Sequence, residues 1–596
     1  MRLSNSLFLL GLSSSMTIAQ GCTDDVVTMM TEGSSTGEST GDTATTQTTQ
    51  TTQTTQTTEL PTTTDPATSD PTTTDPTGLT TTVTTEPDTT TTVGDTSTGT
   101  DTGTTDTSTS ADTTGTTTDT GTGTTTDTGT GTTTGTTGTT ADTDTDTDTD
   151  TGNAAKAQVR VIHGAPDAPP VDVYVQGSLV PAVANLAYGQ TSVYLEVDAG
   201  DYIFEIRPAG SDPNEQPVFV TDVLNLAADS KVSALAAGLI GSNGPEDSFR
   251  VLPFVEGFGP AEENATRVRV IHAGADAPTV DLDIGNDGSP EVDNLARFGE
   301  LGPEGVPLPS GVSLQIGVQT ENNAPVTAFT TPELPDGGEL FVIATGQLAR
   351  LPREAEGFSL LVVGPQGTVG FIRQNPTVYV LHASPDAPNV DVCSLFTPLL
   401  KDVPYGAMAP IQVPPGAYVL SIFAAPSNCL GMPASFQVTP NLTAGNRYLA
   451  AATGELTPED GDPAFKLSTY IDQFPLLDKK NTVFRALHTA SAPAVDIGVV
   501  SNGVIEEVGV LVKNLSWPQQ SALRTAAPEA FELGVAATGP APLNPLAVFD
   551  FAPVSGLRAF VAAAGALTPG PGEKPFGLIL VDTKNDGWTA TPIAPK

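Results

Sequence analysis

The four histidines of the chain are its first candidates for chemistry, because each is followed by aspartate at a regular spacing. In three copies an aspartate lies four residues after the histidine and another lies nine residues after it: His163, Asp167 and Asp172; His272, Asp276 and Asp281; His382, Asp386 and Asp391. The fourth copy, at His488, is one residue shorter; it lacks the first aspartate and keeps Asp496. Histidine beside aspartate can serve as a general base with an orienting carboxylate, or the pair can ligate a metal ion.

The same pattern permits a structural role, which we consider the better interpretation. Counting with a period of two places His163 on the strand face of Val159 and Val161, which is the face expected to point into a core. We therefore expect each histidine to end a core strand and to hydrogen-bond a turn. Asp167 and its equivalents lie among prolines and small residues, where aspartate caps a turn through its own backbone. Asp172 lies between two valines and should face away from them.

Repetition also argues against a catalytic site, because active sites are seldom copied intact four times. Residues 157–596 contain no nucleophile elbow, no zinc-binding His-Glu-x-x-His, no P-loop and no dinucleotide-binding glycine pattern. We therefore expect a protein that is not an enzyme, has no cofactor and binds no metal. An extracellular hydrolase or a metal-binding protein that uses the His/Asp motif is the alternative.

The spacing of the histidines predicts the domain organisation. They lie 109, 110 and 106 residues apart, and a period of that length indicates tandem domains. Two other landmarks recur at matching offsets, one beginning at Asn185 and one consisting of Ala236, Ala237 and Gly238. We expect four repeats, at residues 157–262, 266–374, 376–480 and 481–596, with linkers so short that neighbouring repeats touch.

Within each repeat, short apolar segments alternate with proline and glycine about every 8–12 residues, which predicts strands and turns. Seven or so strands in about 105 residues match an immunoglobulin-like sandwich in size. The sequence therefore predicts an all-β chain with four tandem immunoglobulin-like β-sandwich domains.

The motif also carries a resemblance. The phrase IHGAPDAPPVD at residues 162–172, with its three relatives, resembles the opening motif of a bacterial repeat family known as domain of unknown function 4397. The resemblance extends over most of residues 157–596, in four copies. It implies exported or surface-associated, tandem β-rich units, and it offers no activity to transfer.

The residues before the repeats indicate export. Arg2, an apolar run and small residues lead to Cys22, as in a secretory signal peptide at residues 1–21. The Ala-Gln-Gly-Cys junction at residues 19–22 resembles a bacterial lipobox, which implies a lipid on Cys22. Residues 22–156 are mostly threonine, glycine and aspartate, a composition too poor in apolar residues to build a core. We expect this segment to be a disordered stalk.

Cysteine content supports the same interpretation. The chain has three cysteines, Cys22, Cys393 and Cys429, and an odd number in an exported protein calls for an explanation. Lipidation of Cys22 leaves one pair, which an oxidising compartment would join as a disulfide. A zinc site is a poor alternative, because two cysteines this far apart without clustered histidines lack a zinc-ligand pattern.

Charge excludes one class of partner. The whole chain has a formal net charge of −45, and the part from residue 156 onward, with 23 basic and 47 acidic residues, has −24. Nucleic acid and anionic lipid would repel such a chain. We therefore expect membrane attachment through the N-terminal lipid, an unidentified protein or glycan ligand, and no nucleic acid.

Together these features predict a lipid-anchored cell-surface protein whose β-sandwich modules serve adhesion, recognition or envelope structure. Thr23 follows Cys22, in place of the aspartate that commonly retains lipoproteins in the inner membrane, so we expect the outer membrane, facing outward. A passive spacer that holds another component away from the membrane is a further alternative.

Overall fold

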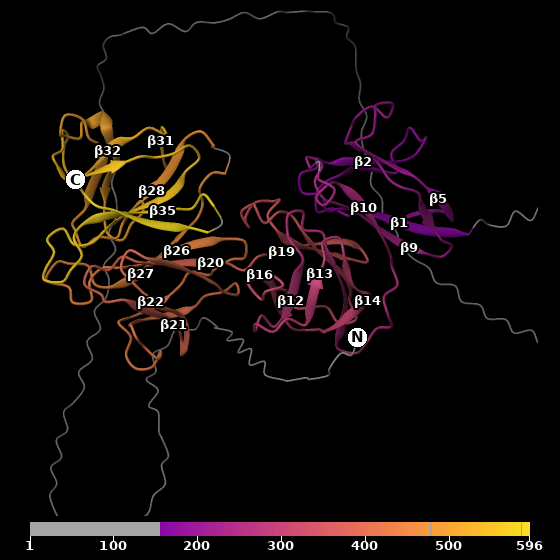
Figure 1. The fold of residues 1–596 in the computed structure, drawn as a ribbon, viewed down its shortest axis with the longest axis horizontal. Helices are drawn as coiled ribbons and strands as arrows, with labels where there is room; N and C mark the ends of the chain where they lie inside the picture. The colour runs from indigo at the N-terminus through magenta and orange to yellow at the C-terminus, as the bar shows by residue number, and fades with distance from the viewer. Residues whose placement is uncertain (1–154, 243, 477–478, 586) are drawn as a thin grey trace, which may run out of the picture. The chain divides into compact units, whose positions relative to one another are not determined.

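The computed structural model describes residues 155–596, apart from residues 243, 477–478 and 586 (Figure 1). The predicted signal peptide at residues 1–21, Cys22 and the stalk up to residue 154 lie outside the described residues. Within the described part the chain is all-β, which confirms the predicted fold class: 36 strands build pairs of packed sheets, and the one helical segment is the short η1 (Glu507–Gly509).

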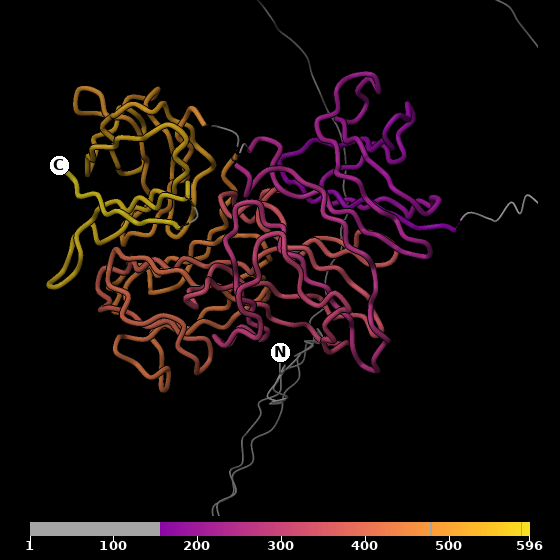
Figure 2. Tube along the Cα trace, turned by 45° about the vertical axis from the view of Figure 1, so that its right-hand side comes forward, coloured from indigo at the N-terminus to yellow at the C-terminus, as the bar shows by residue number. Residues whose placement is uncertain are grey.

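The strands form four groups, which we call modules 1 to 4. Each module has two main sheets. The histidine sheet contains the strand that ends at the motif histidine, and the aspartate sheet contains the strand that carries the second aspartate of the motif. Figure 2 follows the chain through the modules from indigo to yellow.

Modules 1 and 2 comprise the strands before residue 374. Module 1 contains β1 (Lys156–His163), β2 (Val171–Val175), β3 (Val183–Leu186), β4 (Leu195–Asp198), β5 (Gly200–Tyr202), β6 (Phe204–Pro208), β7 (Phe219–Val220), β8 (Leu224–Leu226), β9 (Lys231–Ala237) and β10 (Arg250–Val255). Module 2 contains β11 (Ala265–His272), β12 (Val280–Ile284), β13 (Val292–Leu295), β14 (Glu300–Pro309), β15 (Gln315–Gln319), β16 (Pro325–Thr330), β17 (Glu339–Thr345), β18 (Ser359–Gly364) and β19 (Gly367–Arg373). Their histidine sheets have the orders β10-β9-β1-β4 and β14-β11-β17-β18-β19, and their aspartate sheets β3-β2-β6-β7 and β13-β12-β15-β16. A small sheet pairs β5 with β8.

Modules 3 and 4 repeat the plan. Module 3 contains β20 (Thr377–His382), β21 (Val390–Ser394), β22 (Thr397–Val403), β23 (Met408–Gln412), β24 (Val419–Ala424), β25 (Ser435–Val438), β26 (Arg447–Thr453) and β27 (Lys466–Ile471). Module 4 contains β28 (Thr482–His488), β29 (Val495–Val499), β30 (Val510–Leu515), β31 (Arg524–Ala526), β32 (Phe531–Ala537), β33 (Pro545–Phe551), β34 (Arg558–Ala564), β35 (Gly577–Asp582) and β36 (Thr589–Ile593). Their histidine sheets have the orders β23-β20-β26-β27 and β31-β28-β34-β35-β36, and their aspartate sheets β22-β21-β24-β25 and β30-β29-β32-β33.

The histidine strand always runs parallel to the strand that ends in the small-residue landmark. The pairs are β1 with β9, β11 with β17, β20 with β26 and β28 with β34, and all other described strand pairs are antiparallel. The register places His163 beside Ala236, with the same pairing in the other modules. A parallel pair needs a long crossover connection, and here that connection contains the whole aspartate sheet and one further strand of the histidine sheet. The fold therefore brings the motif and the landmark together at one end of each sandwich.

Each module encloses its own apolar core between its two sheets. In module 1 that core includes Val159, Val171 and Ile206, from both sheets, and each of the other modules has an equivalent cluster. The predicted inward face of the histidine strand, with Val159 and Val161, contributes to this core. Alternation along the strand leaves Arg160 and Ile162 on the opposite face, where a solitary sandwich would meet water.

That opposite face is also buried, because modules pack together through the outer faces of their histidine sheets. Ile162 and Leu235 of module 1 share an apolar cluster with Ile271, Phe341 and Leu361 of module 2. A second cluster joins modules 3 and 4 in the same manner and contains the stacked rings of Tyr379 and Trp588, whose centroids lie 4.3 Å apart. Contacts between modules 2 and 3 are polar instead, for example the Arg353 guanidinium on the Asp472 carboxylate at 3.3 Å.

Two buried arginines complete the contact between modules 1 and 2. Arg160 donates from Nη1 to the Gly364 carbonyl of module 2 at 2.7 Å and pairs with Glu256 at 3.1 Å. Arg269, at the same position of module 2, donates to the Val255 carbonyl of module 1 at 2.7 Å. Both side chains are almost fully buried, so their hydrogen bonds offset the cost of removing a charge from water.

We predict that Arg160→Ala lowers the free energy of unfolding by about 3–5 kcal/mol, because it removes the cation paired with the buried Glu256 carboxylate, which then keeps only the hydroxyl donors of Tyr194 and Ser233. Lys156→Ala is the control: it removes the exposed Lys156–Asp198 pair and should cause no measurable change. Urea unfolding of both variants checks the prediction, and equal stabilities would contradict it.

Candidate functional site

The four motif histidines all make the same hydrogen bond. The ring Nε2 lies 3.2, 2.8, 2.9 and 3.0 Å from the carbonyl oxygens of Pro169, Pro278, Pro388 and Pro493, in the turn that follows each histidine strand. A carbonyl only accepts, so each Nε2 donates and carries the proton. All four side chains are almost completely buried, and this burial lowers the pKa of each ring below its ordinary value of 6.5. The rings are therefore neutral links between a core strand and a turn.

The other ring nitrogen gives no opening for general-base chemistry. Nδ1 of His272 and Nδ1 of His382 each lie 3.4 Å from a backbone N–H two residues later, which donates to them. Nδ1 of His163 and Nδ1 of His488 are buried and have no hydrogen-bond partner. A base must reach a proton on its substrate, and a nitrogen enclosed in this way does not.

The first aspartate of the motif accepts hydrogen bonds from a distant loop. The Asp167 carboxylate accepts from the N–H groups of Ile240 and Gly241, both at 2.9 Å. Asp276 and Asp386 make equivalent pairs of bonds with Leu348 and Ala349 and with Leu456 and Thr457. The prediction that these aspartates cap their own turns is therefore wrong: their partners lie about 70 residues later, where no local pattern points to them.

The loop that binds this aspartate starts at the small-residue landmark, which explains the glycine there. Gly238 has φ of +81°, and a Cβ on it would lie 2.4 Å from the Ser248 carbonyl oxygen. Both the backbone conformation and the lack of space require glycine. Gly346, Gly454 and Gly565 are in the same position.

The second aspartate holds a residue in the left-handed backbone conformation. Asp172 accepts from the N–H of Asn185 at 2.6 Å, and Asn185 has φ of +51°. The equivalent bonds run from Asn294 to Asp281, from Asp402 to Asp391 and from Asn514 to Asp496, and each donor also has positive φ. Asparagine and aspartate tolerate this conformation better than most residues. The recurring phrase that begins at Asn185 is thus the partner of the motif.

The same aspartates reach a second loop. Asp172 and Asp391 also accept from the N–H groups of Gly210 and Ser427, at 2.9 and 2.6 Å. Burial alone would raise the pKa of Asp391, but the N–H donors of Asp402 and Ser427 outweigh it and lower that pKa below its usual value. Carboxylate oxygens engaged in this way are poor candidates for binding a metal ion.

The fourth module shows how the motif changes when one part is lost. Without the first aspartate, the loop after its landmark binds the backbone instead: the N–H of Leu567 donates to the Ser491 carbonyl at 3.2 Å. The second aspartate, Asp496, keeps its bond to Asn514. In the described residues no group of three or more histidine, cysteine, aspartate and glutamate side chains is arranged to hold a metal ion.

Cys393 and Cys429 are joined by a disulfide, with 5.9 Å between their Cα atoms. Cys393 lies on the outer side of the module 3 aspartate sheet, and Cys429 belongs to the loop between β24 and β25. With Phe423 the two cysteines form a small buried cluster, which fixes this loop against the sheet.

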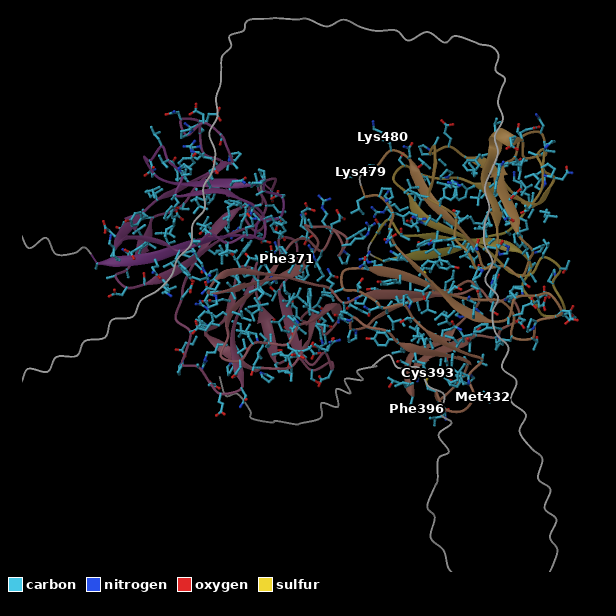
Figure 3. All side chains as sticks on the ribbon, turned by 180° about the vertical axis from the view of Figure 1, so that it is seen from behind. Phe371, Cys393, Phe396, Met432, Lys479 and Lys480 are labelled. Atoms are coloured by element: carbon cyan, nitrogen blue, oxygen red, sulfur yellow. A yellow bond between two sulfur atoms is a disulfide. The ribbon has the colours of Figure 1, made fainter. Side chains whose placement is uncertain are left out.

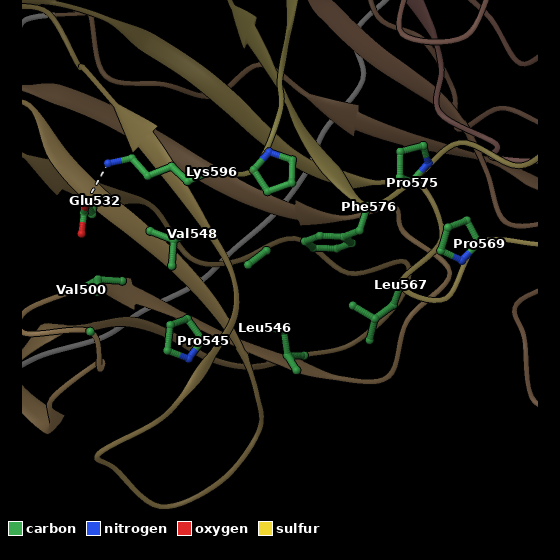
Figure 4. A pocket seen from close by; sticks show the side chains of 13 residues that line it. Val500, Glu532, Pro545, Leu546, Val548, Leu567, Pro569, Pro575, Phe576 and Lys596 are labelled. Atoms are coloured by element: carbon green, nitrogen blue, oxygen red, sulfur yellow. Dashed lines mark hydrogen bonds and ion pairs between the residues drawn. The ribbon is translucent and has the colours of Figure 1, made fainter.

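One hollow in module 4 is a candidate for binding a ligand (Figure 4). Its volume is about 640 Å³, and it is lined largely by apolar side chains, among them Pro545, Leu546, Pro575 and Phe576. Lys596 and Glu532 lie at one side of it, with 2.6 Å between Nζ and a carboxylate oxygen. Such a surface offers apolar contact and one ion pair, and none of the four histidines lines it.

Sequence reasoning missed one surface feature. Six large apolar side chains of module 3 are exposed near the disulfide: Leu395, Phe396, Leu430, Met432, Phe436 and Val438. The signal that could have revealed them is a stretch almost free of charge, since Lys401 and Asp402 are the only charged residues from 392 to 446. Among the described residues no helix is long and apolar enough to cross a bilayer.

We predict that the stability of the protein falls as the pH drops from about 7 to about 5. The folded-state pKa of each motif histidine is lowered, so the unfolded chain takes up protons first, and stability present above about pH 6.5 is lost below it. Each unit of pKa shift corresponds to about 1.4 kcal/mol for each ring. His163→Ala should lower stability at pH 7 by about 1–3 kcal/mol and should flatten the pH dependence. Urea unfolding at several pH values decides, and an unchanged slope in the variant would contradict the prediction.

We also predict that Cys393 and Cys429 are linked in the protein isolated from its native compartment. Peptide mapping without reductant should recover the two cysteines in one fragment. Replacing both by serine should lower the free energy of unfolding by about 3–4 kcal/mol, because the bond restricts the unfolded chain. Free thiols at both positions in freshly isolated protein would refute the link.

Comparison with known proteins supports the resemblance in part. Residues 157–283 and 376–498 match the model of DUF4397, a domain of unknown function. Each matched segment ends in the second strand of the following module and so contains two of the four histidine motifs; together the segments cover less than half of the chain. No curated protein matches the sequence. Among solved structures, the Bacillus anthracis TIE protein is similar over 69% of this chain and 68% of its own, at 10% identity and with a TM-score of 0.12.

Proposed function

We propose that this chain is a non-catalytic cell-surface protein, anchored by a lipid on Cys22, whose four β-sandwich modules recognise or adhere to a partner. The observation that carries the proposal is the use of the repeated His/Asp motif. Its histidine and aspartate side chains are buried or bound to main-chain groups of their own module. Residues committed in this way support architecture and leave little for chemistry on a substrate.

The contacts between modules favour a rigid arrangement of binding surfaces and disfavour a chain of independently moving modules. Apolar clusters join module 1 to module 2 and module 3 to module 4, so neighbouring modules present their surfaces in a defined arrangement. A rigid binding surface loses less entropy on association than a mobile one. The DUF4397 matches and the all-β fold are compatible with a surface module.

Charge restricts the partner. The modules have a net charge of −24, which disfavours nucleic acid and anionic lipid headgroups as direct ligands. Attachment to the outer membrane is therefore assigned to the lipid on Cys22, and a protein or glycan is left as the ligand. The hollow in module 4 and the exposed side chains of module 3 are the surfaces to examine first.

We predict that Cys22→Ser abolishes membrane attachment. Two-phase detergent partitioning should place the native protein in the detergent phase and the variant in the aqueous phase, because the described modules contain no long apolar helix to replace the lipid. Digestion of intact cells with protease tests the outward orientation. Equal partitioning of the two proteins would overturn the anchor, and complete protection on intact cells would overturn surface display.

The soluble Cys22→Ser chain also serves to find the ligand. Applied to glycan and protein arrays, it should bind a restricted set of partners and should release no product from them. A chain that binds nothing would favour the passive spacer, and turnover that is lost on replacing the motif histidines would favour the hydrolase.

A further inference from the structure

The module 3 aspartate sheet has an apolar outer face, which we call the module 3 patch: Leu395, Phe396, Leu430, Met432, Phe436 and Val438. Figure 3 shows Phe396 and Met432 at the outer edge of the module, beyond Cys393. Met432 is 95% exposed, Phe396 75% and Phe436 63%. Large apolar side chains that are scattered singly over a surface need no explanation, but a group of them marks an interaction site.

Strand register shows that the members of the patch are neighbours. Cys393 pairs with Ser421 and Ser421 pairs with Phe436, so the disulfide and Phe436 lie in one row across the sheet. In the next outward-facing row, Val438 pairs with Val419, beside the position of Leu395. Leu430 and Met432 follow Cys429 in the loop that the disulfide fixes to this face.

The patch is held in place before any partner arrives. The disulfide ties the Cys429 loop to β21, and Leu395 and Cys429 both have positive φ, a conformation that non-glycine residues seldom adopt. Side chains that are fixed in advance cost less entropy on binding. Backbone strain of this kind persists where the surrounding structure enforces it, and it is concentrated at functional sites.

The equivalent face is closed or polar in the other modules. In module 1, Glu205 and Arg207 form an ion pair there at 2.7 Å. In module 2, Gln319 donates to Asp283 at 2.9 Å. In module 4, Ile505 and its neighbours cover the face, packed so closely on Gly534 that a Cβ there would lie 3.0 Å from Ile505. Among the described modules, module 3 alone exposes phenylalanine and methionine side chains on this face, some of them from the loop that the disulfide fixes to it.

Charge distinguishes this face from the rest of the array. Residues 392–446 carry one positive and one negative side chain, whereas the modules together have −24. Two copies of so acidic a chain repel each other at most orientations, and the repulsion is least where the facing surfaces are neutral. The apolar outer faces of the histidine sheets are already covered by another module of the same chain.

From these observations we infer that the module 3 patch is a contact between two copies of this chain. A two-fold axis through the patch packs the outer face of this sheet against the same face of the second copy, so that Met432, Phe436 and Val438 are buried at the contact. The contact repeats between chains what the paired modules do within one chain. It does not depend on the lipid anchor.

The test is sedimentation velocity of the soluble Cys22→Ser chain between about 1 and 100 μM, where contacts of moderate affinity become visible. We expect the weight-average sedimentation coefficient to rise with concentration. Phe436→Glu or Met432→Glu should weaken the association at least about tenfold, because each places negative charges at an apolar contact. Val508→Glu is the matched control, since Val508 in module 4 is 98% exposed and lies outside the patch; it should associate like the parent.

A mixture of Phe436→Glu with Phe436→Lys adds a test that misfolding cannot imitate. If the two-fold contact is correct, the mixture associates more tightly than either variant alone. A parent chain that stays monomeric at every concentration would overturn the inference, as would equal effects of Phe436→Glu and Val508→Glu. Flotation of a monomeric parent with phosphatidylcholine vesicles, abolished by Met432→Glu, would assign the patch to lipid and would also refute the second copy.

Discussion

The structure of every module depends on a buried carboxylate that accepts a main-chain N–H group from the strand that follows it, 11–18 residues later. Asp172 and its equivalents each fix a left-handed residue at the end of the strand that follows, and three of the four modules add a second carboxylate for the loop after the landmark glycine. Unpaired N–H groups in such turns would cost about 1–3 kcal/mol each. At this end of each module, main-chain segments are therefore held together by hydrogen bonds to charged carboxylates, and the neutral histidine ring adds one further hydrogen bond.

This constraint explains which parts of the motif vary. Module 4 loses the first aspartate, and the Ser491 carbonyl replaces it as acceptor for one N–H group. It keeps Asp496, which accepts from the N–H of the left-handed Asn514. A structural role of the motif predicts that the first aspartate can be lost while the second is kept. A catalytic or metal-binding role would make the histidine and both aspartates equally necessary.

Sequence reasoning succeeded where the pattern was local. The all-β class and the inward face of β1 follow from alternation and spacing, and the structure confirms the fold class and places Val159 and Val161 at the core. It failed where the partner was distant in the sequence, because nothing near Asp167 points to Ile240. Alternation along β1 also suggests that Arg160 and Ile162 face water, whereas the next module buries them. The disulfide could be predicted from the number of cysteines alone. The apolar surface around it could not, because it depends on which residues the strand register brings side by side.

The two sheets of each module differ in what lies against their outer faces, and the surface that varies most among the modules belongs to the aspartate sheet. The histidine sheet faces another module and is therefore constrained on both sides, which accounts for fully buried residues such as Ile162 and Leu235. The outer face of the aspartate sheet is where the four modules differ most: it has an ion pair in module 1, a hydrogen bond in module 2, a disulfide-fixed loop with apolar side chains in module 3, and a covering loop in module 4. The pair of modules, and not the single sandwich, is the unit within which every apolar face of the histidine sheets is covered.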